Sequence, residues 1–79
     1  MVTKASAIIG RRLSLARARR NLTMAELAVK AGVSPSTVNL IEKSKRSPTA
    51  ETVEGLARAL DVDPCWLAYG TGTEPNWKS

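Results

Sequence analysis

The chain has no histidine and a single cysteine, Cys65, and these two scarcities exclude several kinds of site. One cysteine cannot form an intramolecular disulfide, and without histidine it cannot complete the Cys and His ligand sets that hold zinc. A Cys–His nucleophile is excluded for the same reason. We therefore interpret Cys65 as a small, partly buried apolar residue, and the sequence predicts no metal and no cofactor.

Aromatic residues and long apolar runs are also scarce. The chain lacks Phe, and no apolar run approaches the roughly 18–20 residues that cross a bilayer. The early apolar patch, Ala5–Ile9, is too short for the core of a signal peptide. We expect a protein that stays in the cytoplasm and has no membrane contact. A glycine-rich phosphate loop and a clustered carboxylate pair are missing as well, which argues against an enzyme.

Positive charge is in excess, and it is unevenly distributed along the chain. Residues 1–48 contain ten Lys or Arg and two Glu, a balance of +8, whereas residues 49–79 contain two Lys or Arg and five Asp or Glu, a balance of −3. Such an asymmetry indicates that a polyanion binds one face of the molecule, although a merely solvated basic surface would look the same. Four arginines, namely Arg11, Arg12, Arg19 and Arg20, are expected to be largely solvated.

Apolar residues recur with helical spacing throughout, and no alternating pattern indicates a strand. Five segments have their own start or stop signals. In chain order these are Asn21 after the first helix, Thr23 and Gly32 around the second, Ser34 before the third, Thr49 before the fourth and Asp63 before the fifth. The sequence therefore predicts an all-α fold, a five-helix bundle over residues 1–70. A flexible tail is expected over residues 71–79.

The segment Leu27–Glu42, with the sequence LAVKAGVSPSTVNLIE, meets the demands of two helices that cross through a tight turn. Ala28 must be small because the next helix passes directly over it, and Gly32 supplies a positive φ where the chain reverses. The outer face of the second helix of this pair begins with small or flat residues, and basic residues follow it. Such a face suits the major groove of DNA.

The combined spacing resembles that of the lambdoid phage repressors and the wider Xre-type regulator family over residues 8–72. The residues that carry the resemblance are L-T-M-A-E-L-A, A-G-V-S, I-E, L-A-R-A-L-D-V and W-L-A-Y-G. The resemblance implies a bundle of the lambda repressor-like type, with a helix-turn-helix over residues 23–43 whose third helix, about residues 34–43, enters the major groove. It also implies homodimers that bind palindromic operators in double-stranded DNA near the nucleoid, most simply as a transcriptional repressor.

By this analogy, six residues at the start of the third helix are candidates for reading bases. They are Ser34, Pro35, Ser36, Thr37, Asn39 and Leu40. Ser36 can exchange a hydrogen bond with a base edge, and Leu40 can pack on a thymine methyl group. Ser34 also has the character of a helix N-cap, and Asn39 could equally form a hydrogen bond between helices.

Phosphate contacts are implied at five positions, which are Thr23, Met24, Lys43, Lys45 and Arg46. The chain departs from the family pattern at three places. Met24 stands where a glutamine commonly holds a phosphate, Pro35 stands where relatives carry a base-reading Gln or Arg, and Ser44 replaces a Gly or Asn. Specificity is therefore expected to depend partly on DNA deformability.

The family resemblance also implies an ion pair between Arg17 and Glu42, and each of these residues lies on the apolar side of its helix. The last helix, with Trp66, Leu67 and Tyr69, is the usual dimer contact of the family, although Trp66 and Leu67 are as well explained as core residues.

Two other interpretations stay open. The chain could be the N-terminal domain of a longer, two-domain repressor, because residues 70–75 resemble the start of a linker. Alternatively, the same scaffold could be a protein-interaction module, such as an antitoxin-like protein or a co-regulator, with an unidentified protein partner. An exposed Leu40 and the missing Gln and Arg donors favour this second interpretation.

Overall fold

The computed structural model describes the backbone of residues 4–73 and of Pro75, with side chains from Ile9 onward. Within this part of the chain there are five helices and no strand. They are α1 (Lys4–Arg19), α2 (Met24–Ala31), α3 (Pro35–Glu42), α4 (Ala50–Leu60) and α5 (Pro64–Tyr69). The predicted all-α, five-helix architecture is confirmed.

The predicted helix boundaries coincide with caps that satisfy the otherwise unpaired backbone groups at helix ends. The Thr23 hydroxyl accepts a hydrogen bond from the Glu26 amide, and the Glu26 carboxylate accepts one from the Thr23 amide, which forms the expected capping box. Asn21 and Gly32 adopt the left-handed conformation, with φ of 56° and 74°. The side chains of Ser34, Thr49 and Asp63 likewise accept hydrogen bonds at the N-termini of their helices.

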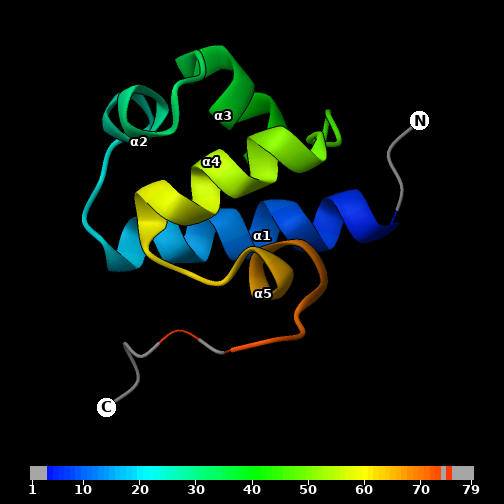
Figure 1. Ribbon diagram of the computed structural model, residues 1–79. Coiled ribbons are helices and arrows are strands. Elements are labelled where there is room, and N and C mark those ends of the chain that lie inside the picture. The colour runs from blue at the N-terminus through cyan, green and yellow to red at the C-terminus, as the bar shows by residue number, and fades with distance from the viewer. Residues whose placement is uncertain (1–3, 74, 76–79) are drawn as a thin grey trace.

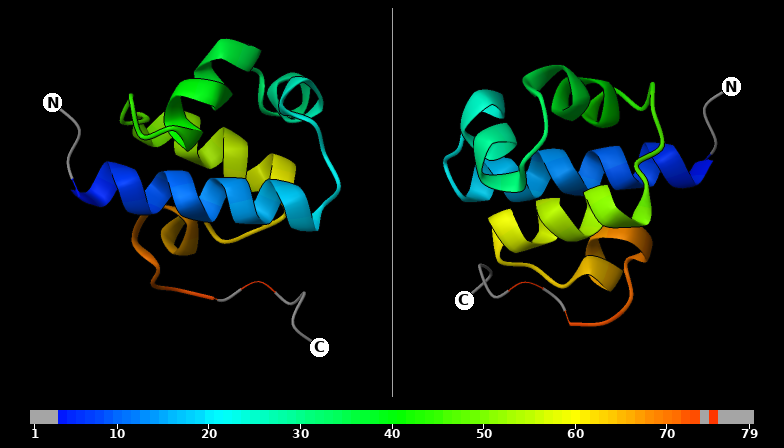
Figure 2. Two further views of the ribbon diagram at one scale, coloured as in Figure 1. Left: turned by 180° about the vertical axis from the view of Figure 1, so that it is seen from behind. Right: turned by 45° about the horizontal axis from the view of Figure 1, so that its top comes forward.

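Helix α1 lies in the middle of the molecule and separates α3 from α5. Figures 1 and 2 show α2 and α3 on one side of α1 and α5 on the other. Helix α1 contacts both α3 and α5, α2 contacts α3 and α4, and α4 contacts α5. Every helix contributes to the buried core, whose largest fully buried side chains are Leu13, Leu27, Val38, Ile41, Leu56, Leu60 and Leu67. The apolar stripes predicted from the sequence therefore face a single core.

Two arginines that were expected to be solvated donate to carbonyl oxygens at the C-terminal ends of other helices. Arg12 of α1 is half-buried, so the expectation is wrong for it, whereas Arg20, which follows α1, is exposed as expected. Arg12 donates from Nε and Nη2 to the carbonyl oxygens of Leu67 (2.8 Å) and Ala68 (3.0 Å) in α5. Arg20 donates from Nε to the carbonyl oxygen of Leu60 at the end of α4, at 2.8 Å. The last carbonyls of a helix have no intrahelical donor and carry partial negative charge, which attracts a guanidinium. Burial in this position lowers the pKa of Arg12.

The segment after α5 folds back onto the start of that helix. Asp63, the N-cap of α5, accepts hydrogen bonds from the amides of Cys65 (2.7 Å) and Thr73 (3.2 Å). Residues 71–73 are therefore tied to α5, and the rest of the expected flexible tail, residues 74 and 76–79, lies outside the described residues. Cys65 itself is exposed rather than partly buried, because it occupies the outer side of the first turn of α5. No helix in the described residues has the length and apolar character to cross a membrane.

Candidate nucleic-acid interface

The turn between α2 and α3 sets the direction in which α3 leaves α2. Gly32, with φ of 74°, ends α2, and the Val33 amide donates to the carbonyl oxygen of Ala28 at 3.0 Å. Ala28 is fully buried, as its position under the crossing requires, and Val33 packs against the core. The inner face of α3 is closed, because Val38 and Ile41 have no exposed surface. The opposite face of α3 is therefore the one that meets solvent.

The six candidate base-reading residues lie together at the start of α3, with different exposure. Ser34, Pro35 and Ser36 are exposed, whereas Thr37, Asn39 and Leu40 are half-buried. The Thr37 amide donates to Ser34 Oγ at 3.2 Å, and the hydroxyls of the two residues are hydrogen-bonded to each other at 2.9 Å. Ser34 is thus an N-cap, and its hydroxyl and that of Thr37 are both engaged.

Basic residues surround the other end of α3. Lys43, Lys45 and Arg46 are exposed, and the helix ends in a turn at these residues. In this turn Ser44 has a φ of 62°, the Lys45 amide donates to the Leu40 carbonyl (2.8 Å) and the Ser44 amide donates to the Ile41 carbonyl (3.0 Å). These are the two bonds of a Schellman motif, in which Gly is the usual residue at the left-handed position. Ser44 occupies that position here.

The remaining two phosphate candidates lie at the start of α2. Thr23 is exposed, and its hydroxyl, which accepts from Glu26, still has a proton to donate. Met24 is half-buried and packs against the core, so its side chain belongs to the protein interior.

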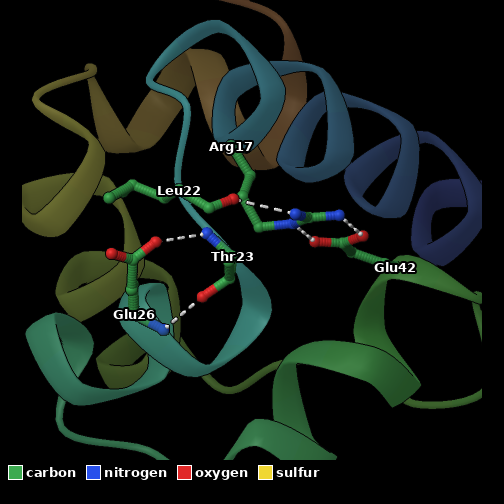
Figure 3. A network of polar contacts seen from close by, with 5 residues as sticks. All are labelled: Arg17, Leu22, Thr23, Glu26 and Glu42. Carbon is green, nitrogen blue, oxygen red and sulfur yellow. Dashed lines mark hydrogen bonds and ion pairs between the residues drawn. The ribbon is translucent and has the colours of Figure 1, made fainter.

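The predicted ion pair between Arg17 and Glu42 is present and joins α1 to the end of α3 (Figure 3). Arg17 donates from Nε to Glu42 Oε2 at 2.6 Å and from Nη2 to Oε1 at 3.1 Å, which is a bidentate pair. Its Nη1 donates to the carbonyl oxygen of Leu22 at 2.9 Å, just before α2. The Glu42 side chain is only 6% exposed. The hydrogen bond to Glu42 raises the pKa of Arg17, which keeps the guanidinium charged.

A helix-turn-helix family model (HTH_3) matches residues 13–67, which is most of the chain. The chain belongs to this helix-turn-helix family. Among curated relatives, the HTH-type transcriptional regulator PrtR of Pseudomonas aeruginosa is 43% identical over 61 residues, which make up 77% of this chain and 23% of PrtR. This chain therefore spans less than a quarter of the length of that relative.

Solved structures of other helix-turn-helix proteins have the same fold. The restriction-modification controller protein C.AhdI from Aeromonas hydrophila is 31% identical, with a TM-score of 0.76, over 78% of this chain and 94% of its own. The P22 c2 repressor, solved in complex with a synthetic operator, is 28% identical, with a TM-score of 0.77, over 81% of this chain and 97% of its own. The resemblance inferred from the sequence motifs is confirmed.

Two glycines, Gly10 and Gly55, let the helix-turn-helix pack closely against α1 and α4, and the sequence analysis did not identify them. A Cβ added to Gly10 of α1 would lie 2.6 Å from the carbonyl oxygen of Ile41, near the end of α3. A Cβ added to Gly55 of α4 would lie 2.9 Å from the carbonyl oxygen of Ala31, at the end of α2. An isolated glycine inside a helical pattern often marks such a close backbone approach, and this signal could have found both.

The three residues proposed for a dimer contact of this helix-turn-helix protein differ in burial. Leu67 is fully buried and Trp66 is 8% exposed, so both belong to the protomer's own core. Tyr69 is 75% exposed, and it lines a shallow pocket with Ile9, Val53 and Cys65. Of the three side chains, Tyr69 is the one with surface to offer to a second copy.

Proposed function

We propose that the chain is a sequence-specific, double-stranded DNA-binding transcriptional regulator that acts as a repressor and inserts the first two turns of α3 into the major groove. The observation that carries this proposal is the asymmetry of α3. Its inner face, at Val38 and Ile41, is fully buried, while its first turn is exposed and three exposed cations follow its C-terminal end. A helix with one buried and one uncovered face beside cations suits a groove lined by phosphates. The similar P22 c2 repressor was solved in complex with a synthetic operator, which supports operator DNA as the partner.

The proposal gives the exposed cations Lys43, Lys45 and Arg46 the role of neutralising phosphates, together with the hydroxyl of Thr23. Met24 takes part through its backbone amide at the start of α2, where the helix dipole favours an anion. Each cation that contacts a phosphate contributes about −0.9 to the slope of log K against log salt. The three cations therefore predict a slope of about −2.7 per protomer.

We further propose that a homodimer binds two half-sites about 34 Å apart, one helical turn along DNA in the cytoplasm. Helix α5 lies on the side of α1 away from α3 (Figure 1), and its exposed residue Tyr69 is the candidate contact with a second copy. A sedimentation experiment with and without operator would give the stoichiometry.

Fluorescence anisotropy with labelled duplex DNA, measured between about 50 and 200 mM salt, tests the proposed function. Lys45→Ala should weaken binding and reduce the slope by about 0.9 per protomer, whereas Arg58→Ala should leave both the affinity and the slope unchanged. Arg58 is a matched control because it is an exposed cation on α4, in the acidic part of the chain. A slope near zero, or equal effects of the two variants, would contradict the proposal.

A protein-interaction module is the second candidate, and the partly exposed apolar Leu40 of α3 is the observation that favours it. An apolar protein interface responds little to salt, since it releases no condensed counterions. The same titration therefore separates the two candidates.

A further inference from the structure

Three residues other than glycine have a positive φ within the described part of the chain. They are Asn21 (56°), Asp61 (56°) and Ser44 (62°). Asparagine and aspartate tolerate the left-handed conformation, because their short polar side chains can form local hydrogen bonds, and serine does not share this preference. Ser44 is therefore the one of the three whose conformation is unfavourable for its residue type. Strain of this kind persists only where the surrounding structure imposes it, and it is concentrated at functional sites.

Contacts with two helices hold Ser44 in this conformation. On the side of α3, the Ser44 amide donates to the carbonyl oxygen of Ile41 at 3.0 Å, and the Lys45 amide donates to that of Leu40 at 2.8 Å. On the side of α1, Ser44 is half-buried, and its hydroxyl oxygen lies 3.1 Å from the position that a Cβ on Gly10 would occupy. Because Gly10 has no Cβ, the serine side chain can lie against the backbone of α1.

A side chain at position 44 narrows the range of conformations that the turn can adopt. In the left-handed region an L-residue is confined to a φ of about 50–70° and a ψ of about 30–60°. Glycine ranges over positive φ far more freely, since it has no Cβ. Compared with glycine, Ser44 therefore lowers the stability of the fold, but it leaves the residues next to it in the turn less freedom to move.

The residues whose freedom is reduced are the cations of the proposed interface. Ser44 stands between Lys43 and Lys45. Arg46 follows, and all three cations are exposed. A loop that is ordered before binding loses less conformational entropy when its charges meet their partner. The strain at Ser44 therefore bears on the affinity of this basic turn, residues 43–46, for phosphates.

Resting on the DNA-binding function proposed above, we infer that Ser44 is a positioning residue, which holds the basic turn in its DNA-binding conformation before DNA binds. It increases affinity by lowering the entropy that the three cations lose on binding, and it adds no phosphate contact of its own. Replacing it with glycine therefore has different effects on folding and on binding. The fold stays at least as stable because the strain is relieved, whereas DNA binding weakens because the turn is less ordered.

Ser44→Gly tests the inference in the anisotropy titration with labelled duplex DNA. Its affinity, corrected for the fraction of folded protein, should fall by about two- to five-fold for each protomer bound, the factor that corresponds to the difference in backbone freedom. The slope of log K against log salt should stay that of the wild type, because the same phosphates are neutralised in the complex. The urea midpoint of the variant should equal or exceed that of the wild type.

Asp61→Gly is the matched control, since Asp61 also has a left-handed φ and its side chain is 98% exposed. It makes the same backbone change at the C-terminal end of α4, whereas the basic turn precedes the N-terminal end of α4, and it should leave DNA affinity unchanged. Ser44→Asn is the rescue variant, because asparagine has a Cβ and tolerates a positive φ, and its affinity should stay close to that of the wild type. Backbone NMR order parameters at Lys45 and Arg46 should be lower in Ser44→Gly than in these two variants.

The outcomes separate this inference from the proposed function. Unchanged affinity of Ser44→Gly, an equal loss in Asp61→Gly, or binding by Ser44→Asn as weak as that of Ser44→Gly would overturn the positioning role while DNA binding stands. A loss of affinity with a smaller salt slope would overturn it as well, since a phosphate contact would then have been removed. Salt-independent binding by the wild-type chain would remove the proposed function itself.

Discussion

Replacing Glu42 with Ala removes the carboxylate that holds the end of α3 to α1. In the intact protein this carboxylate accepts two hydrogen bonds from Arg17, at 2.6 and 3.1 Å, and its side chain is 6% exposed. The variant leaves the Arg17 guanidinium with the Leu22 carbonyl as its remaining partner among those described. A charged group that loses its counterion inside a protein destabilises the fold, because the cost of removing it from water is no longer offset.

The size of the loss follows from the exposure of the two partners. Removing one partner of a fully buried pair costs about 3–5 kcal/mol. Because the Arg17 side chain keeps 20% of its surface exposed, water can reach it, and we expect a loss near or below the lower end of that range, about 2–3 kcal/mol. A domain of this length has a total stability of about 4–12 kcal/mol, so the variant loses a large part of it.

Urea unfolding followed by circular dichroism measures the effect. With a slope of about 1 kcal/mol per molar urea for so small a domain, the midpoint of Glu42→Ala should fall by about 2–3 M. Asp61→Asn is the control, since Asp61 approaches Arg20 at 4.0 Å but its side chain is 98% exposed, and asparagine tolerates the φ of 56° at this position. Exposed pairs contribute little to stability, so the control midpoint should barely move.

A double variant refines the test. Arg17→Met with Glu42→Leu leaves no unpaired charge and should recover most of the stability lost in Glu42→Ala. The reasoning about an uncompensated charge is wrong if Glu42→Ala unfolds at the same urea concentration as Asp61→Asn. It is also wrong if the stability loss of the double variant equals the sum of the losses of Arg17→Met and Glu42→Leu measured singly.

Three further predictions concern the seating of the helices. Gly10→Ala should destabilise the fold by about 1–3 kcal/mol because the new Cβ would lie 2.6 Å from the Ile41 carbonyl oxygen. Gly32→Ala has open space around the new Cβ but a φ of 74°, and it should destabilise the fold by about 1–2 kcal/mol. The urea midpoints of the two variants measure both losses. When DNA affinity is corrected for the fraction of folded protein, it should fall for Gly10→Ala and stay unchanged for Gly32→Ala. Equal affinities of the two variants would contradict the close contact between Gly10 and the end of α3. Lowering the pH should release residues 71–73 from α5. Hydrogen bonds from the amides of Thr73 and Cys65 lower the pKa of Asp63 in the folded protein. The stability that ionised Asp63 contributes is therefore complete above about pH 3.9, its usual unfolded pKa, and is lost as the pH falls through the lower folded pKa. Amide exchange at Thr73 between pH 5 and 2.5 measures the release, and pH-independent exchange protection would contradict it.

Local signals predicted most of the fold because the residues that carry them act within one turn of helix. The capping box of Thr23 and Glu26 and the left-handed residues Asn21 and Gly32 depend on neighbours no more than four or five residues away. Their chemistry is therefore visible in a short stretch of sequence. The Arg17–Glu42 pair is a longer-range contact, and a family resemblance together with the apolar side of each helix was needed to predict it.

The contacts that sequence reasoning missed join residues far apart in the chain through backbone atoms. Arg12 reaches carbonyl oxygens 55 and 56 residues away, and Arg20 reaches one 40 residues away. A carbonyl oxygen leaves no signature in the sequence, since every residue has one. For the same reason the close approach of Gly10 to the Ile41 carbonyl could be suspected from the glycine alone but not assigned to a partner.

These contacts also change what the charge asymmetry means. The excess of cations in residues 1–48 indicated a polyanion partner, but three of the ten serve the fold, because Arg12, Arg17 and Arg20 each hold the C-terminal end of a different helix. Arg12 and Arg17 of α1 thus hold α5 and α3, and Arg20, the residue after α1, holds α4. The net charge of that part therefore overstates the electrostatic attraction available to DNA. In the proposed DNA complex, the salt dependence of binding is set by a smaller set of cations, the exposed Lys43, Lys45 and Arg46 that follow α3.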